Sequence, residues 1–165
     1  MNIKSKAIQS SAYFSDCEKY RYALIRKFSD GPKTINFIML NPSTADQFYN
    51  DPTISKCENR SLALGFNKMV ITNLFAYRAT DPNDMMAVED PIGERNDIHI
   101  LDNATKADTV VCAWGNGGQH RRRSDDIVKL LKKNKIKLHA LKINSSGEPS
   151  HPLYLSNKLE LFEWK

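Results

Sequence analysis

The chain has 165 residues, of which 41% are hydrophobic and 26% charged. This size and composition suit one globular domain, and we expect a single domain over residues 1–165. No apolar run approaches the length of a membrane span, and the first residues lack the apolar stretch of a secretory signal. The three cysteines, Cys17, Cys57 and Cys112, are widely separated, which indicates neither a disulfide framework nor a cysteine-rich metal site. We therefore expect a cytoplasmic protein without a membrane partner.

The net charge is +5, and the basic excess is concentrated in one segment. Between Arg121 and Lys137, lysines and arginines far outnumber acids. A basic stripe of this kind indicates a polyanionic partner, and we predict DNA-backbone contacts for Arg121, Arg122, Arg123 and Lys129. The competing interpretation is the solvated face of an ordinary helix.

The first predicted elements are two strands and a helix. Residues 20–28 alternate in side-chain character and predict a strand that joins the sheet as an antiparallel edge. Residues 34–40 form a continuous apolar run, as expected of a strand covered on both faces. Asp51 followed by Pro52 is a helix-start signal, and that helix should end near Gly65.

Strands and helices then alternate to the end of the chain. Strands are predicted at 67–74, 109–114 and 137–143, and helices at 92–106 and 122–134. This alternation is typical of a parallel sheet with right-handed crossovers. The predicted fold is therefore α/β, a three-layer α/β/α sandwich with a central, mainly parallel sheet.

The carboxyl ends of these strands are where we expect the functional site. Asn41, Asn73, Trp114 and Ile143 each end a predicted strand and precede a polar or glycine-rich loop. In open α/β sheets such ends meet at one edge, where ligands bind.

Asn41 and Pro42 end the first apolar strand. Pro42 restrains Asn41 to an extended conformation, and the Asn41 amide could orient a water or a substrate, with Ser43 beside it. The competing interpretation is an Asx turn. We predict a catalytic role for Asn41 and substrate contacts for Pro42 and Ser43.

Two acids follow in the same loop. Asp51 is best explained as a helix N-cap, whereas Asp46 has no such role and is predicted to be a catalytic carboxylate that polarises water or stabilises positive charge. No histidine or third acid stands at convincing spacing, so no metal site is predicted.

Aromatic and amide side chains near these strand ends are candidate base contacts. Phe48 and Tyr49 could stack on a base or cover the edge of the core. Asn73 could read a base edge through its donor and acceptor, or cap its strand, and Tyr77 and Arg78 could close the pocket. All five are predicted substrate-binding residues.

His151 lies in a late loop after Ser150 and before Pro152. A single loop histidine is more often a surface residue, but the apolar Leu153 and Tyr154 that follow suit insertion into a base stack. Docking of the C-terminal tail is the alternative. We predict that His151 is catalytic and that Leu153 and Tyr154 bind substrate.

Gly115–Gly118 could cradle a phosphate before the basic helix. The segment matches neither the P-loop nor the dinucleotide fingerprint, and the chain has no Gly-x-Ser-x-Gly elbow. No cofactor is predicted.

Several sequence blocks together resemble a bacterial and phage family known as a domain of unknown function. These blocks are residues 37–46, 51–54, 73–80, 113–115 and 151–155. The resemblance covers nearly all of the chain after Tyr20.

More distantly, the layout is similar to the uracil-DNA glycosylase superfamily. That likeness implies that Asn41 positions the attacking water, Asn73 helps to read the base, and His151 with Leu153 supports the leaving base and the wedge. The chain departs from the pattern at Met39-Leu40 before the first motif and at Leu153-Tyr154 after His151-Pro152. A base other than uracil is therefore expected.

Residues and resemblance together predict a DNA glycosylase that hydrolyses the N-glycosidic bond of a flipped, modified base, with a role in defence against phage that carry modified DNA. The expected partner is double- or single-stranded DNA, and the expected state is a monomer. The alternatives are a non-catalytic nucleic-acid-binding module and a hydrolase of free nucleosides or nucleotides.

Overall fold

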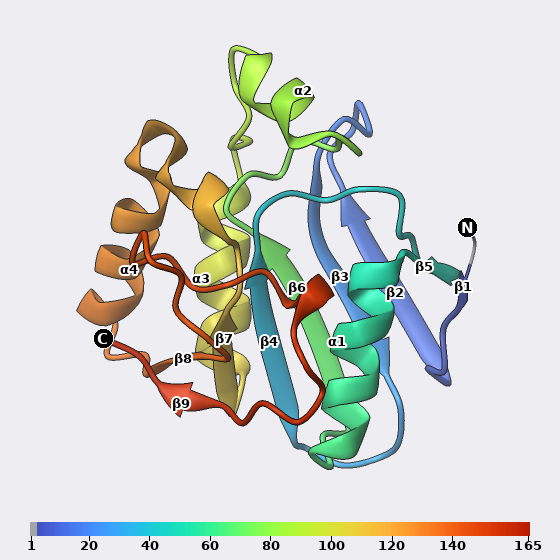
Figure 1. The fold of residues 1–165 in the computed structure, drawn as a ribbon. Helices are drawn as coiled ribbons and strands as arrows, with labels where there is room; N and C mark the ends of the chain where they lie inside the picture. The colour runs from blue at the N-terminus through green and yellow to red at the C-terminus, as the bar shows by residue number, and fades with distance from the viewer. Residues whose placement is uncertain (1–2) are drawn as a thin grey trace.

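The structure is a computed structural model that describes residues 3–165. Its centre is a seven-stranded sheet in the order β2-β3-β6-β4-β7-β8-β9 (Figure 1). The strands are β2 (Gln9–Phe14), β3 (Arg21–Lys27), β4 (Thr34–Met39), β6 (Lys68–Asn73), β7 (Thr109–Cys112), β8 (Leu138–Ala140) and β9 (Phe162–Glu163).

The sheet is parallel only at its centre. Strand β4 pairs in parallel with β6 and β7, and β7 with β8, whereas β2, β3 and β9 join antiparallel. The predicted α/β class is confirmed. The sheet is mixed rather than mainly parallel, because antiparallel strands flank the parallel centre on both sides.

The strands β1 (Ile3–Lys4), β2, β5 (Tyr49–Asn50) and β9 are not predicted from the sequence. Strand β2 lies outside β3, so the segment expected as the edge is an inner strand. The sequence of β2 is mostly small and polar, and β2 therefore lacks the apolar alternation that identifies strands. A separate two-stranded sheet pairs β1 with β5.

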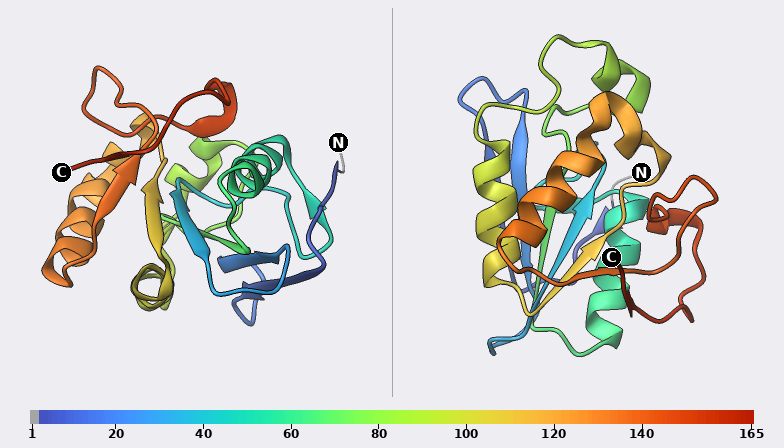
Figure 2. Two further views of the ribbon diagram at one scale, coloured as in Figure 1. Left: turned by 90° about the horizontal axis from the view of Figure 1, so that it is seen from below. Right: turned by 90° about the vertical axis from the view of Figure 1, so that its left-hand side faces the viewer.

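The helices cover both faces of the main sheet (Figure 2). Helix α1 (Pro52–Ala63) lies over one face, where Ile54 and Cys57 pack against Phe37 and Ile71. Helices α3 (Asn96–Lys106) and α4 (Arg123–Lys133) cover the other. A short helix α2 (Pro82–Ala87), the 3-10 segments η1 (Asn116–Arg122) and η2 (Pro152–Tyr154) complete the described elements.

The start of α1 is as predicted. Asp51 is the N-cap, with its side chain accepting a hydrogen bond from the Ile54 N–H at 2.8 Å, and Pro52 is the first helical residue. The cap fixes the Asp51 carboxylate at the end of α1 that faces the carboxyl ends of β4 and β6.

The C-terminal segment runs back across α1. Lys56 donates to the carbonyl of Leu155, and Arg60 donates to those of Ser156 and Leu159. These bonds hold η2, and with it His151, beside the start of α1. Among residues 3–165, no helix is long and apolar enough to cross a membrane.

Candidate functional site

A cavity of about 480 Å³ opens where the carboxyl ends of β4 and β6 meet the start of α1 and η2. Pockets of this size accommodate small organic ligands. Its lining comes from well-separated parts of the chain: Arg21, Met39, Leu40, Asn41, Ser43, Asp51, Pro52, Thr53, Ile54, Ile71, Asn73, Ala79, Thr80, Pro82, His151, Leu153 and Tyr154.

The cavity brings together the three motifs that the sequence singled out. Asn41, Asn73 and His151 all line it, together with Ser43, Leu153 and Tyr154. The parallel register explains the first two, because Met39 of β4 lies opposite Asn73 of β6. Pro42 is buried beside the cavity without lining it.

Asn41 is held by its amide nitrogen. Nδ2 donates to the carbonyl of Pro42 at 3.1 Å and to that of Ala79 at 2.8 Å, and the second bond ties the loop after β4 to the loop after β6. The acceptor Oδ1 has no hydrogen-bond partner among residues 3–165. An amide fixed at its nitrogen can present that oxygen to a water or a ligand.

Asn73 presents a buried donor without a partner. The residue is only 1% exposed, and its Nδ2 has no hydrogen-bond partner among the described residues. A buried, unpaired N–H group is costly, so such a group at a cavity wall indicates a missing acceptor.

His151 is set in place by its neighbours on both sides. Its Nδ1 accepts from the Leu153 N–H at 3.4 Å, so a neutral ring carries its proton on Nε2. Gly115, at φ +73°, passes so close that a Cβ there would lie 3.5 Å from the His151 Cβ. Buried Glu148 anchors the preceding loop by accepting hydrogen bonds from Trp114 Nε1 and Ser124 Oγ.

Burial lowers the pKa of His151, and nearby Asp51 opposes this effect. The unfolded chain, with the ordinary value of about 6.5, binds more protons than the folded protein between the two pKa values. We therefore expect the free energy of unfolding to fall as the pH drops below about 6.5 and to stop falling below the lowered pKa.

Urea unfolding of wild type and His151→Asn over a pH series measures this effect, and the variant should lose part of the acid slope. His99, which stacks on Tyr22, also has a pKa lowered by burial. His99→Asn is therefore the matched control and should remove a separate part of the slope. Parallel profiles for wild type and His151→Asn would contradict the expectation.

Asp51 contributes a carboxylate to the cavity as well as capping α1. One oxygen accepts from Ile54 N, and Oδ2 has no donor among residues 3–165. The sequence pattern of Asp51 and Pro52 predicts only the cap. The cap is present, but it occupies only one of the two oxygens.

Asp46, the carboxylate favoured by sequence, does not line the cavity. Its Oδ1 accepts from the N–H groups of Phe48 and Tyr49 in a tight turn. Phe48 and Tyr49 are exposed and also lie outside the lining. The turn occupies a carboxylate oxygen that the sequence-based prediction leaves free for catalysis.

Tyr77 and Arg78 do not line the cavity either. Tyr77 packs edge-on against Tyr20, and Arg78 donates to the Glu18 carbonyl and lies over the Phe14 ring. Both side chains fasten the β2–β3 turn to the loop after β6.

The predicted DNA-backbone residues lie outside the cavity, in and before α4. The prediction that Arg123 contacts the DNA backbone is wrong. Arg123 is buried, donates to the Leu74 carbonyl at 2.8 Å and pairs with Asp97, so it stabilises the fold. Arg121 donates to the carbonyls of Val88 and Glu89. Arg122, which pairs with Asp125, and Lys129 are exposed.

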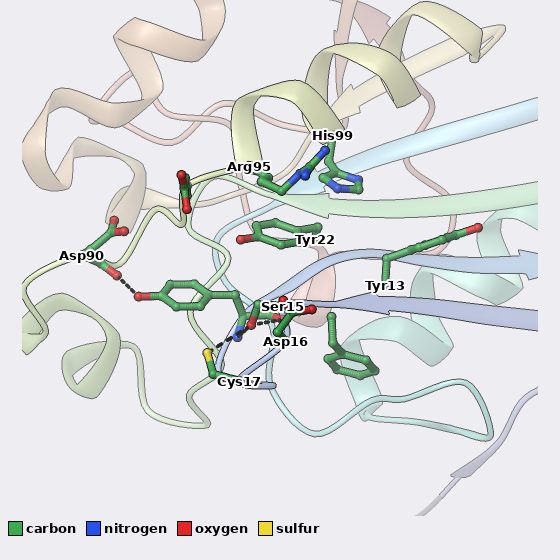
Figure 3. Close-up of a pocket in the computed structure, with 11 residues that line it drawn as sticks. Tyr13, Ser15, Asp16, Cys17, Tyr22, Asp90, Arg95 and His99 are labelled. Atoms are coloured by element: carbon green, nitrogen blue, oxygen red, sulfur yellow. Dashed lines mark hydrogen bonds between the residues drawn. The ribbon is translucent and has the colours of Figure 1, made fainter.

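A second cavity, of about 590 Å³, lies on the α3 face at the β2–β3 end of the sheet (Figure 3). Tyr22 and His99 stack at 4.8 Å, and the Tyr20 hydroxyl donates to the Asp90 carbonyl. Exposed Cys17 lies 3.4 Å from Ser15 Oγ. None of the residues predicted from the sequence lines this cavity, and we favour the first one.

The described residues contain no group of three or more His, Cys, Asp or Glu side chains placed to hold a metal ion. The polar groups that line the first cavity include the amides of Asn41 and Asn73, the Asp51 carboxylate, the His151 imidazole and the Arg21 guanidinium.

Fold and cavity define a mixed α/β protein with a cavity at the carboxyl ends of its parallel strands. Residues 21–153 match the family described as a protein of unknown function (DUF1643), and the chain belongs to that family. No curated protein and no solved structure gave a significant match. Membership of a domain-of-unknown-function family is confirmed, and the more distant glycosylase likeness stays a prediction.

Proposed function

We propose that this protein is an N-glycosyl hydrolase that removes a modified base from DNA after flipping it into the first cavity. The observation that carries the proposal is the convergence of Asn41, Asn73, Asp51 and His151, each with an unused polar atom, on one cavity that is large enough to hold a nucleobase. Arranged in this way, the four groups match the needs of glycosidic-bond hydrolysis.

In this reaction, water attacks the anomeric carbon while the bond from that carbon to the base nitrogen breaks. Asn41 Oδ1 accepts a hydrogen bond from the water and orients it. The free oxygen of Asp51 stabilises the positive charge that develops on the sugar. The His151 Nε2–H donates to the departing base, and the water supplies the proton that the base finally carries.

Base flipping needs a group that fills the gap left in the stack. Tyr154 is 92% exposed at the cavity mouth, an unusual position for a large aromatic side chain. We assign this ring the wedge role, with Leu153 beneath it. Asn73 Nδ2 then donates to an acceptor on the flipped base.

The test is base release from DNA. Duplex and single-stranded oligonucleotides with unmodified bases, uracil, 5-hydroxymethylcytosine or its glucosylated form are incubated with the protein, and abasic sites are detected by alkaline cleavage. We expect release from a modified base, and a loss of about 10²-fold in Asn41→Ala. The matched control is Asn157→Ala, an exposed asparagine outside the cavity.

A second candidate is a hydrolase of free nucleosides or nucleotides. The observation that favours it is that none of the four residues predicted to bind the DNA backbone, Arg121, Arg122, Arg123 and Lys129, lines the cavity. Release from nucleosides but from no DNA would support this candidate against the first. DNA binding without any release would instead indicate a non-catalytic module.

A further inference from the structure

Arg21 reaches the cavity because of a β-bulge. Strand β3 pairs with β2 through Ala23 and Tyr13, and the register then shifts so that Arg21 lies opposite Phe14. Leu24 packs on the α1 face, and regular alternation would direct Arg21 to the opposite face. Instead Tyr22 stacks on His99 of α3, and Arg21 lines the cavity on the α1 side.

The Arg21 guanidinium is buried without an ion pair. The residue is 1% exposed, and its Nη1 donates to the Ala45 carbonyl at 2.6 Å. Its Nε is buried without a partner, and no hydrogen bond from Nη2 to residues 3–165 is formed. Burial lowers the pKa of Arg21 to about 10, with Asp51 the main opposing influence.

The two free nitrogens, Nε and Nη2, form one edge of the planar guanidinium. That edge offers two parallel N–H donors, an arrangement that matches the two oxygens of a carboxylate or phosphate. Buried charges are normally paired, so a buried guanidinium with an unpaired edge at a cavity wall indicates a partner that arrives with the ligand.

Arg26, on the same strand, is a buried arginine whose guanidinium is bound by the protein itself. Its guanidinium is also buried, but Nε and Nη2 bond to Asn50 Oδ1, Nη2 also bonds to the Tyr49 carbonyl, and Glu58 lies 3.9 Å away. Its Nη1 is unpaired, yet Arg26 does not line the cavity. Arg26 is thus tied to the protein, whereas Arg21 faces the ligand space.

We propose that Arg21 determines the specificity of this cavity by binding an oxyanion, either carboxylate or phosphate, on the ligand. The inference rests on the proposed function only in treating the ligand as a nucleoside derivative. The oxyanion belongs either to a substituent of the base or to a phosphate on the sugar.

The test is calorimetric binding of two pairs of probes. One pair is 2′-deoxyuridine and its 5′-monophosphate, and the other is 2′-deoxycytidine and its 5-carboxy derivative. We expect one anionic probe to bind about 10- to 100-fold more tightly than its neutral counterpart. The pair that shows the preference identifies the source of the oxyanion.

Arg21→Met should lower that ratio to about one while keeping the thermal midpoint at or above the wild-type value, because it removes an unpaired buried charge. Arg21→Lys, which keeps the charge without the two-donor edge, should lose most of the preference. The Lys variant decides the matter if the Met variant does not fold.

Three results would overturn the proposal: no anionic preference in wild type, an unchanged ratio in Arg21→Lys, or a large fall in the Arg21→Met midpoint with the ratio retained. Base release is measured separately. Anion preference without release would therefore refute the glycosylase proposal alone, and release without anion preference would refute the role of Arg21 alone.

Discussion

Asp51→Asn is expected to slow base release by about 10²- to 10³-fold while leaving the stability of the fold nearly unchanged. Asparagine is as good an N-cap as aspartate, so the hydrogen bond to Ile54 N survives the substitution. What disappears is the negative charge beside the sugar. The variant thus separates the two roles of one side chain.

Asp51→Ala removes both roles. We expect the same loss of activity and an additional cost of about 1 kcal/mol in the free energy of unfolding, measured by urea titration. If Asp51→Asn kept full activity and only Asp51→Ala were impaired, Asp51 would be a cap and nothing more.

Asp46→Asn is the matched comparison, because asparagine also supports the turn that Asp46 makes with Phe48 and Tyr49. The sequence favours Asp46 as the reacting carboxylate, and the cavity lining favours Asp51. A larger loss of base release in Asp46→Asn than in Asp51→Asn would decide for Asp46. Near-wild-type activity in Asp46→Asn would decide for Asp51.

The convergence of the motifs follows from information that is local in the sequence. Apolar runs identify β4, β6 and β7, parallel pairing brings their carboxyl ends together, and Asn41 and Asn73 stand at two of those ends. His151 is different, since its position depends on the C-terminal segment that α1 holds through Lys56 and Arg60. Its prediction as a site residue rests on the apolar Leu153 and Tyr154 that follow it in the loop, and on the motif resemblance.

The arginines show why the remaining features of the site could not be predicted from the sequence. Arg123 is buried because the Leu74 carbonyl and Asp97 are available to it, and both come from distant parts of the chain. Arg21 reaches the cavity because of a bulge that residue alternation does not reveal. Tertiary contacts decide whether an arginine side chain lies in solvent, donates to a carbonyl or binds a ligand. The pattern of charges along the sequence does not contain that information.

The second large effect concerns stability, and it centres on Glu58 in the middle of α1. This carboxylate is 2% exposed and accepts hydrogen bonds from Ser5 Oγ at 2.7 Å, Lys6 N at 2.6 Å and Asn50 Nδ2 at 3.1 Å. Its Oε2 also lies 3.9 Å from Arg26 Nε. One buried side chain thus joins the N-terminal segment, strand β5 and strand β3.

Glu58→Ala should lower the free energy of unfolding by about 3–5 kcal/mol, because it leaves the buried Arg26 charge without its carboxylate. Since domains are stabilised by only about 5–15 kcal/mol, much of the folded population should be lost at modest urea concentrations. The midpoint of urea unfolding should fall with an unchanged slope. Exposed Glu160→Ala is the control and should stay within about 0.5 kcal/mol.

The same network should connect stability to the site. Arg26 also donates to the carbonyls of Asp46 and Tyr49, so it holds the loop that leads from Asn41 to Asp51. Arg26→Met combined with Glu58→Leu removes both buried charges and should cost less than the sum of the single changes, since neither partner is left unpaired. Additive costs would show that Arg26 and Glu58 act independently, with the loop carbonyls as the true partners of Arg26.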